Sequence, residues 1–337
     1  MKKHLLFPGL SLMLICVSLI SLTLGKYPVA IGDIFSFLGL RLFNCDGLSP
    51  EKLALLHSLF INIRLPRILA ALLIGASLSV SGAAFQSMFV NPLVSPGLLG
   101  VLAGASFGAA FGMVFSRSWI AVQGFSLAFG FMAVIISIGI AKIHRGNSVL
   151  LLVLGGVISG ALFTALLSII KYIADPYNQL PAITQWLMGG LALVNFGTLK
   201  VASIPIIAGI IAITLMSGYL NALSMGDEEA RALGIPVEKV RMLLIFFSTM
   251  ISAITVVMAG MIGWVGLIIP HISRMLVGPD NKLLIPACAL IGASYLILVD
   301  DLSRMAFAVE VPIGITTSLI GIPFFVIVLR NARKAWN

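Results

Sequence analysis

The sequence predicts an all-α polytopic membrane protein with about ten transmembrane helices and one short helix on the cytoplasmic side. Of its 337 residues 60% are apolar and only 10% are charged, whereas about a quarter of a soluble chain is charged. The apolar residues run on for about 20 positions, the length of a spanning helix, and do not alternate as barrel strands do. In hydrocarbon only helices and closed barrels satisfy every backbone hydrogen bond. A single transmembrane domain over residues 1–337 is therefore expected.

The excess of basic residues, a net charge of +9, is expected to anchor helix ends on the cytoplasmic side. In a soluble protein it would suggest nucleic acid, but basic runs interleaved with aromatic residues are absent, so nucleic acid is not an expected partner. The three cysteines, Cys16, Cys45 and Cys288, form no C-x-x-C pair, and His, Cys, Asp and Glu do not cluster at metal-ligand spacing. Membrane lipid is the expected surrounding, and no metal site is predicted.

Runs without charged residues place the spans along the chain. The ten predicted spans are residues 5–25, 63–88, 97–115, 120–141, 148–170, 201–221, 241–261, 264–277, 283–299 and 311–330. The first run follows Lys2 and Lys3, but it is longer than the apolar core of a signal peptide and lacks a clear A-x-A cleavage site. We therefore expect an uncleaved first span with its amino end inside. Ten spans then place both termini in the cytoplasm, with the protein in the cell inner membrane.

The second and third spans are separated by the breaker-rich residues 91–96, Asn-Pro-Leu-Val-Ser-Pro. The third span repeats glycine at every fourth position, as Gly100, Gly104, Gly108 and Gly112. Such a ridge of small residues lets helices approach closely in lipid. Tight packing within the chain is the favoured interpretation of the ridge, and a dimer seam is the alternative.

The longest polar stretch on the cytoplasmic side covers about residues 222–240 and predicts a short helix of about two turns. Three acidic residues stand where a helix amino end favours negative charge, and a glycine followed by a proline ends the helix. Ala230 and Leu233 are expected to share one apolar face in a charged frame. The segment is either a plain loop or a docking helix; its residues are Asp227, Glu228, Glu229, Ala230, Arg231, Leu233 and Gly234.

The chain shows no energy source of its own. It has no G-x-x-x-x-G-K-[ST] motif to hold nucleotide phosphates, and no Ser/His/Asp arrangement can be assembled from adjacent motifs. The predicted spans carry no Asp or Glu near their centres, whereas ion- or proton-coupled carriers usually use such acids. We therefore expect no catalytic residues and no cofactor in this chain. An ion- or proton-coupled secondary transporter is the alternative, followed by a scaffold without transport.

Six sequence blocks stand out along the chain. Residues 227–234 carry an E-x-A-x-x-L-G core. The other blocks are Arg-Leu-Pro-Arg at 64–67, Ser-Gly-Ala-Ala-Phe-Gln at 81–86, Asn-Pro-Leu-Val-Ser-Pro-Gly-Leu-Leu-Gly at 91–100, Gly-Leu-Ile-Ile-Pro-His-Ile-Ser-Arg at 266–274 and Glu-Val-Pro-Ile-Gly at 310–314. Residues 227–234 look like the coupling helix of ABC-transporter permeases, and the blocks together resemble the FecCD family of ABC importer permeases. They follow the family's order from about residue 60 to 330, and the first 60 residues match only in general character.

This resemblance implies the permease subunit of a binding-protein-dependent ABC importer. It implies a homodimer around a central pathway, two ATP-binding subunits on the cytoplasmic side and a soluble or anchored substrate-binding protein outside. ATP and Mg would then be bound by the partner ATPase, so the permease itself is not an enzyme. The implied cargo is a metal chelate (iron–siderophore, haem or cobalamin), or molybdate or tungstate in one branch of the family.

The resemblance also implies roles for individual residues. Arg64, Arg67 and Arg304 would dock carboxylates of the binding protein, because Arg forms bidentate bonds to carboxylates. From the residues alone, interfacial snorkelling remains open for these arginines, as does internal pairing of Arg304 with Asp300 or Asp301. The implied gate residues are Asn91 and Leu93, with Asn147 and Ser148 as a weaker second set. His271 is expected to be structural, although a ligand role for a haem or metal chelate stays open.

Overall fold

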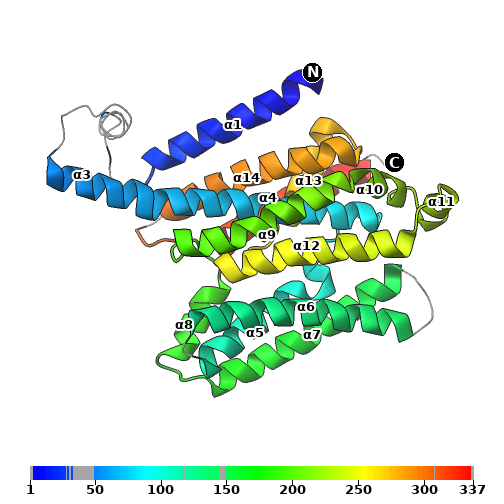
Figure 1. Ribbon diagram of the computed structural model, residues 1–337, viewed down its shortest axis with the longest axis horizontal. Helices are drawn as coiled ribbons and strands as arrows, with labels where there is room; N and C mark the ends of the chain where they lie inside the picture. Colours follow the sequence, from blue (N-terminus) through cyan, green and yellow to red (C-terminus); the bar gives the residue numbers. More distant parts are fainter. Residues whose placement is uncertain are drawn as a thin grey trace.

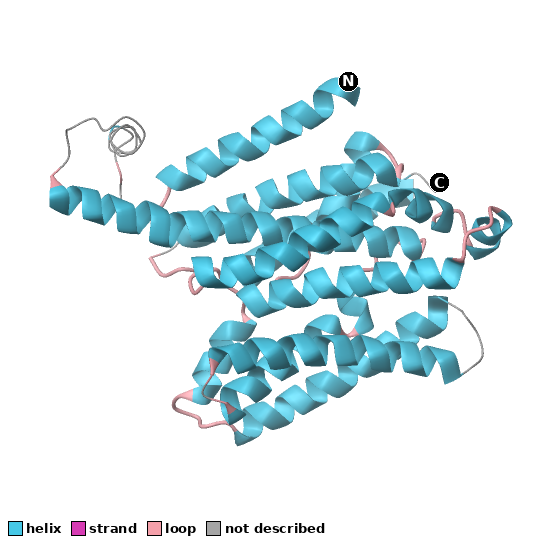
Figure 2. Ribbon diagram, in the orientation of Figure 1, coloured by secondary structure: helices cyan, strands magenta, loops and turns pink. Residues whose placement is uncertain are grey.

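The computed structural model describes residues 3–27, 29, 32, 49–116, 118–143, 149–306 and 308–334. Within them the regular structure is entirely helical (Figure 1, Figure 2). The elements are α1 (Lys3–Thr23), α3 (Pro50–His57), a π-helix (Ser58–Arg64), α4 (Leu65–Met88), a 3-10 helix (Pro96–Leu99), α5 (Val101–Phe115), α6 (Trp119–Ile143), α7 (Val149–Ile173), α8 (Gln179–Leu187), α9 (Phe196–Leu215), α10 (Ser217–Leu223), α11 (Asp227–Ala232), α12 (Val237–Ala259), α13 (Val265–Val277), α14 (Asn281–Met305) and α15 (Ile313–Lys334).

Ten apolar helical segments of the described chain match the ten predicted spans one for one. Seven are long and apolar enough to cross a membrane, and the shorter apolar segments Val101–Phe115, Val265–Val277 and Ile313–Ile327 make up the rest. The prediction of an all-α polytopic protein is confirmed. The short helices α8 and α10 were not predicted: the charge-free stretch that holds α8 was not counted as a span, and α10 shares one charge-free run with α9.

The second span begins much earlier than predicted. The expected start was residue 63, but α3, the π-helix and α4 join into one helical rod from Pro50 to Met88, 39 residues long. Ser49 caps the rod by accepting a hydrogen bond from the Lys52 N–H, and Pro50 stands in the first turn, where its missing N–H costs nothing. Pro66 follows the π-helix, so its missing donor falls where the hydrogen-bond register changes. Arg64 and Arg67 therefore lie inside a continuous helix.

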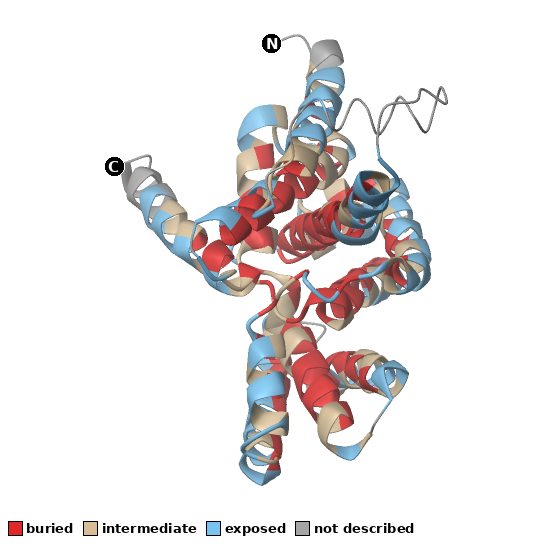
Figure 3. Ribbon diagram, turned by 90° about the vertical axis from the view of Figure 1, so that its left-hand side faces the viewer, coloured by how far each residue is buried: buried red, intermediate tan, exposed pale blue. Residues whose placement is uncertain are grey.

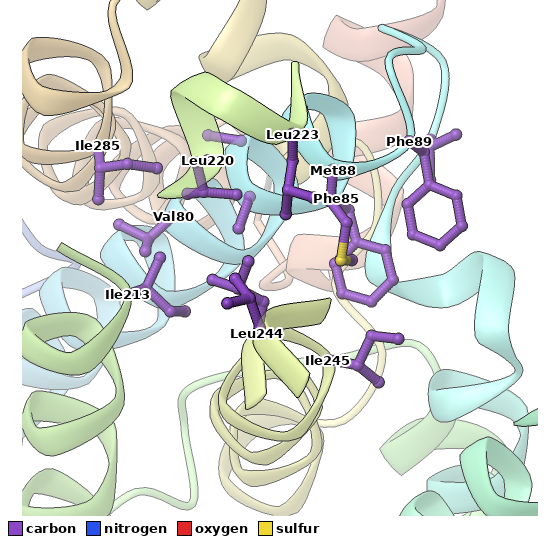
Figure 4. Packing of buried hydrophobic residues seen from close by; sticks show 14 of the residues in the cluster. Val80, Phe85, Met88, Phe89, Ile213, Leu220, Leu223, Leu244, Ile245 and Ile285 are labelled. Atoms are coloured by element: carbon purple, nitrogen blue, oxygen red, sulfur yellow. The ribbon is translucent and has the colours of Figure 1, made fainter. Parts of the chain in front are cut away.

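Helix α4 forms the centre of the molecule. Twenty of its 24 residues are buried, and Figure 3 shows buried residues concentrated on the inner helices with exposed residues around them. Val80, Phe85 and Met88 of α4 pack with Leu220 of α10 and Leu244 of α12 in the main apolar cluster (Figure 4). The outer faces of α1, α7 and α9 instead carry many exposed Leu, Ile and Val side chains, as expected where lipid replaces water.

Glycines set the closest helix contacts. A Cβ added at Gly82 of α4 would lie 2.0 Å from the Gly266 carbonyl oxygen of α13, and one at Gly75 would lie 2.2 Å from the Gly292 carbonyl oxygen of α14. The glycine ridge of α5 faces α6, because Cβ atoms at Gly104 and Gly108 would lie 2.3 and 2.2 Å from backbone oxygens of that helix. The ridge thus packs within the chain, as the favoured interpretation held.

Candidate functional site

The predicted short cytoplasmic helix is present as α11. It begins after Gly226, whose φ of +121° only glycine adopts readily, and it carries Asp227, Glu228 and Glu229 in its first turn. It ends in a Schellman motif: the Ile235 N–H donates to the Ala230 carbonyl (3.1 Å) and the Gly234 N–H to the Arg231 carbonyl (2.9 Å). Gly234 takes the left-handed conformation, with φ +78°, that this motif requires. The short helix therefore has a defined shape at both ends.

Two anchors fix α11 on the bundle. The Asp227 carboxylate forms an ion pair with the largely buried Arg241 of α12. Ala230 is fully buried and belongs to the main apolar cluster together with Val237 and Val240. The methyl group of Ala230 is thus part of the core that holds α11 against α12.

The structure corrects the expectation that Ala230 and Leu233 form one exposed apolar face. Ala230 has no exposed surface, whereas Leu233 is 63% exposed and Met225, at the other end of α11, is 64% exposed. The reason is that Leu233 lies beyond the last helical residue, where the chain turns through Gly234 and leaves the face that Ala230 occupies. Glu228, Glu229 and Arg231 are exposed around it. The exposed apolar side chains at this helix are thus Leu233 and Met225, in a charged frame.

The opposite end of the bundle holds a cluster of six charged residues. It brings together Arg64 and Arg67 of the rod, Asp300, Asp301 and Arg304 of α14, and Glu310 of the loop before α15. Arg67 donates to both Asp300 oxygens (Nη2–Oδ1 2.7 Å, Nε–Oδ2 2.8 Å) and to Glu310 (Nη1–Oε2 3.2 Å). Three positive and three negative groups balance, which is the condition for burying charges.

The other two arginines of this cluster also have partners inside the protein. Arg304 pairs with Asp301 and with Asp300 (Nε–Oδ2 3.2 Å), and Ser21 of α1 donates to Asp301 at 2.7 Å. Arg64 donates to the backbone carbonyls of residues 22 and 23 at the end of α1 and of residue 27 in the loop that follows it. These contacts tie α1, α4 and α14 together at one end of the bundle.

The arginines expected to face a partner are therefore buried, at 3, 7 and 8% exposure for Arg64, Arg67 and Arg304. Of the open alternatives, the structure shows internal pairing of Arg304, because Asp300 and Asp301 lie one helical turn before it in α14. The pairing of Arg67 with Asp300 and Glu310 was not predicted from the sequence. Two adjacent acids at the end of an apolar helix were the available signal, since buried acids need a cation nearby.

The residues proposed as a gate lie in an exposed loop between α4 and α5. The Asn91 side-chain oxygen accepts the Leu93 N–H at 2.9 Å, an Asx-turn, and Leu93 is 51% exposed. The loop follows the last turn of α4, where the Gln86 carbonyl accepts the Asn91 N–H at 3.1 Å. The Gln86 side chain is buried and accepts a hydrogen bond from Arg274 of α13 at 3.0 Å. The second set, Asn147 and Ser148, lies outside the described residues.

Two further features lie near these sites. The ring of His271 contacts Phe324 of α15 edge-on, with centroids 6.4 Å apart, and the described residues contain no group of metal-ligating side chains placed to hold an ion.

A cavity of about 440 Å³ lies beside the charged cluster. Its polar and aromatic lining consists of Trp119, Gln123, Gln185, Trp186, Thr198 and Glu310. No sequence pattern pointed to this cavity.

The sequence and the fold match known transport proteins over nearly their whole length. The sequence profile of the FecCD transport family matches residues 12–331. A molybdate import permease of Haemophilus influenzae is 37% identical over 330 residues, covering 98% of this chain and 96% of that protein. A probable iron chelatin transport permease of Helicobacter pylori is 38% identical over 288 residues, covering 85% and 86%. A vitamin B12 import permease of Salmonella paratyphi A is 37% identical over 331 residues, covering 96% and 95%.

Solved structures give the same result for the fold. An inward-facing metal-chelate type ABC transporter superposes with a TM-score of 0.86 at 36% identity, covering 98% of this chain and all of that chain. A Streptococcus pneumoniae protein, PsaBC, superposes with a TM-score of 0.60 at 19% identity, covering 87% and 94%, and shares the fold alone.

Proposed function

Because the chain belongs to the FecCD transport family and is thus the permease subunit of a binding-protein-dependent ABC importer, we propose that it imports a metal chelate or a molybdate-like oxyanion. Permeases of this family hydrolyse no ATP themselves, and the partner ATPase supplies the energy. The observation that supports the cargo classes is that relatives named for molybdate, iron chelate and vitamin B12 match at 37, 38 and 37% identity. Identity alone therefore leaves these classes equal.

The test is uptake into proteoliposomes that contain the permease with its ATPase and binding protein. Labelled molybdate, a ferric chelate and cobalamin are offered separately on the binding-protein side of the membrane. Each is tested with and without ATP on the side that carries the ATPase. ATP-dependent uptake of one of them identifies the cargo. Uptake that needs a proton gradient and no ATP contradicts the importer and supports the secondary transporter.

The proposed assembly is a homodimer with two ATP-binding subunits against α11 and a binding protein at the charged cluster. Its support is the placement of the two candidate sites at opposite ends of the bundle, with α11 at one end and α3 at the other (Figure 1). The start of α1 lies toward the α11 end in the same view. An even number of spans then puts both termini on the ATPase side, in the cytoplasm.

We propose that α11 receives the movement of the ATPase through Leu233. Leu233→Asp places a charge in the apolar centre of this contact without touching the core, because the side chain is 63% exposed. We expect ATP-driven uptake to fall at least tenfold while thermal unfolding of the permease stays unchanged. Uptake and ATPase activity of the assembled transporter, measured together, check the prediction.

Leu233→Met is the matched control, since it keeps an apolar side chain of similar size. It should leave uptake within about twofold of the wild type. Normal uptake by Leu233→Asp would show that α11 does not carry the coupling contact. Ala230→Asp cannot serve here, because burial of Ala230 makes it a folding variant.

We propose that the loop at Asn91 and Leu93 forms part of the cytoplasmic gate, with Asn147 and Ser148 as a second part. The support is that Leu93 is exposed on a loop held by the Asn91 turn and by the Gln86–Arg274 bond. Leu93→Cys should crosslink between the two permease subunits in one nucleotide state of the transporter and not in the other. Crosslinking to the same extent in both states would contradict a gating role.

A further inference from the structure

Arg67 is held by two acidic side chains of unequal accessibility. The Asp300 side chain is 2% exposed, whereas the Glu310 side chain is 33% exposed. Asp300 stands within α14 and also pairs with Arg304, while Glu310 belongs to the short loop between α14 and α15. Asp300 is thus a fixed part of the buried cluster, and Glu310 is the partner that can leave Arg67 without disrupting a helix.

The neighbouring cavity can accommodate the Glu310 carboxylate after it separates from Arg67. Glu310 lines this cavity of about 440 Å³ together with Gln123, Gln185 and Thr198. Amide and hydroxyl groups donate hydrogen bonds to carboxylates, and a cavity of this size admits water. A Glu310 carboxylate that has separated from Arg67 is therefore solvated or hydrogen-bonded in the cavity. It does not become a buried unpaired charge, which is the usual penalty for breaking such a pair.

This inference rests on the proposed docking of a binding protein at this end of the bundle. We propose that Glu310 pairs with Arg67 in the free permease, and that a carboxylate of the binding protein replaces Glu310 on Arg67 when the two proteins dock. The six-residue cluster is neutral, so adding a partner carboxylate alone would leave an excess negative charge. Exchange of Glu310 for that carboxylate keeps both the charge balance and the forked geometry of the guanidinium. The partner surface that fits this end is therefore acidic.

The exchange also acts on the elements around Glu310. The Val311 N–H donates to the Ser303 carbonyl at 3.1 Å, and the Ile313 N–H donates to the Gly189 carbonyl at 3.0 Å. Release of Glu310 removes the anchor next to these two bonds, at the first turn of α15 and at the loop after α8. Docking would thereby alter the contacts that hold the first turn of α15, the start of the last span.

The test is the Glu310→Gln variant in the assembled transporter held in nanodiscs. Glutamine keeps the shape of the side chain but loses the charge that competes for Arg67, while the Arg67–Asp300 pair remains. The probe is the purified substrate-binding protein of the same importer, without cargo. We expect its Kd to fall at least fivefold. Glu238→Gln removes the same charge from an exposed site of α12 beside α11, at the opposite end of the bundle, and should change the Kd less than twofold.

An Arg67→Lys variant measured in parallel separates this proposal from the docking proposal beneath it. Lysine keeps the charge but cannot form the forked contact. If Arg67→Lys weakens binding tenfold or more and Glu310→Gln leaves it unchanged or weaker, docking on Arg67 stands and the exchange is wrong. If neither variant changes the Kd, both are wrong. Thermal unfolding of each variant confirms that folded transporters are compared.

Discussion

Replacing Asp300 with asparagine should destabilise the folded permease by about 3–5 kcal/mol. Asp300 neutralises Arg67 through three hydrogen bonds and Arg304 through a 3.2 Å ion pair, and its side chain is 2% exposed. Asparagine has nearly the same shape, but it removes the negative charge and turns an amide N–H₂ toward two arginines. The cluster would then hold a buried, uncompensated positive charge. Equilibrium unfolding in mixed micelles, followed by tryptophan fluorescence, measures the loss.

Glu238→Gln is the control for the loss of one negative charge. The side chains of Glu238 and Arg231 are 63 and 48% exposed and their charged atoms are 3.8 Å apart, and exposed pairs of this kind contribute only about 0–1 kcal/mol. The control should therefore unfold close to the wild type. An Asp300→Asn variant as stable as this control would mean that the cluster does not hold the helix ends together.

The second large effect is expected from Gly82→Ala, at about 3 kcal/mol of lost stability. The added methyl would lie 2.0 Å from the carbonyl oxygen of Gly266 and 2.6 Å from its Cα. Both atoms belong to the backbone of α13, so no side chain can move aside, and α4 and α13 must separate. Apolar atoms normally keep about 3.5–4.0 Å apart, so the whole contact between these helices loosens. Equilibrium unfolding and the yield of folded protein from membranes both report it.

Gly124→Ala provides the matched control on another transmembrane helix. A Cβ at Gly124 of α6 meets no atom within 4 Å, and alanine favours a helix over glycine by up to about 1 kcal/mol. This variant should be as stable as the wild type or slightly more stable. Equal stability of Gly82→Ala and Gly124→Ala would show that the contact between α4 and α13 tolerates separation.

The spans were predictable because the length of an apolar run is a property of the local sequence. The same holds for α11, whose acidic start and glycine stop are local signals. The start of the second span was missed because Glu51, Lys52 and His57 interrupt the apolar pattern, although Ser49 and Pro50 form a helix-start signature. Local capping signals outweigh mean hydropathy there.

The site was predictable only where a role depends on neighbours in sequence. Arg67 meets Asp300, 233 residues away, and no spacing rule connects the two positions. The burial of Ala230 likewise depends on α12 lying beneath α11, which periodicity over six residues cannot show. The arginines were therefore identified as important, but their partners came from the tertiary structure.

The rod from Pro50 to Met88 is too long for the bilayer it crosses. Its 39 residues span roughly 58 Å at helical rise, against a hydrocarbon core of about 30 Å. A rod of this length, set along the membrane normal, leaves about its amino-terminal third outside the hydrocarbon. If the proposed docking occurs at this end, a soluble partner meets this protruding segment before it reaches the lipid headgroups.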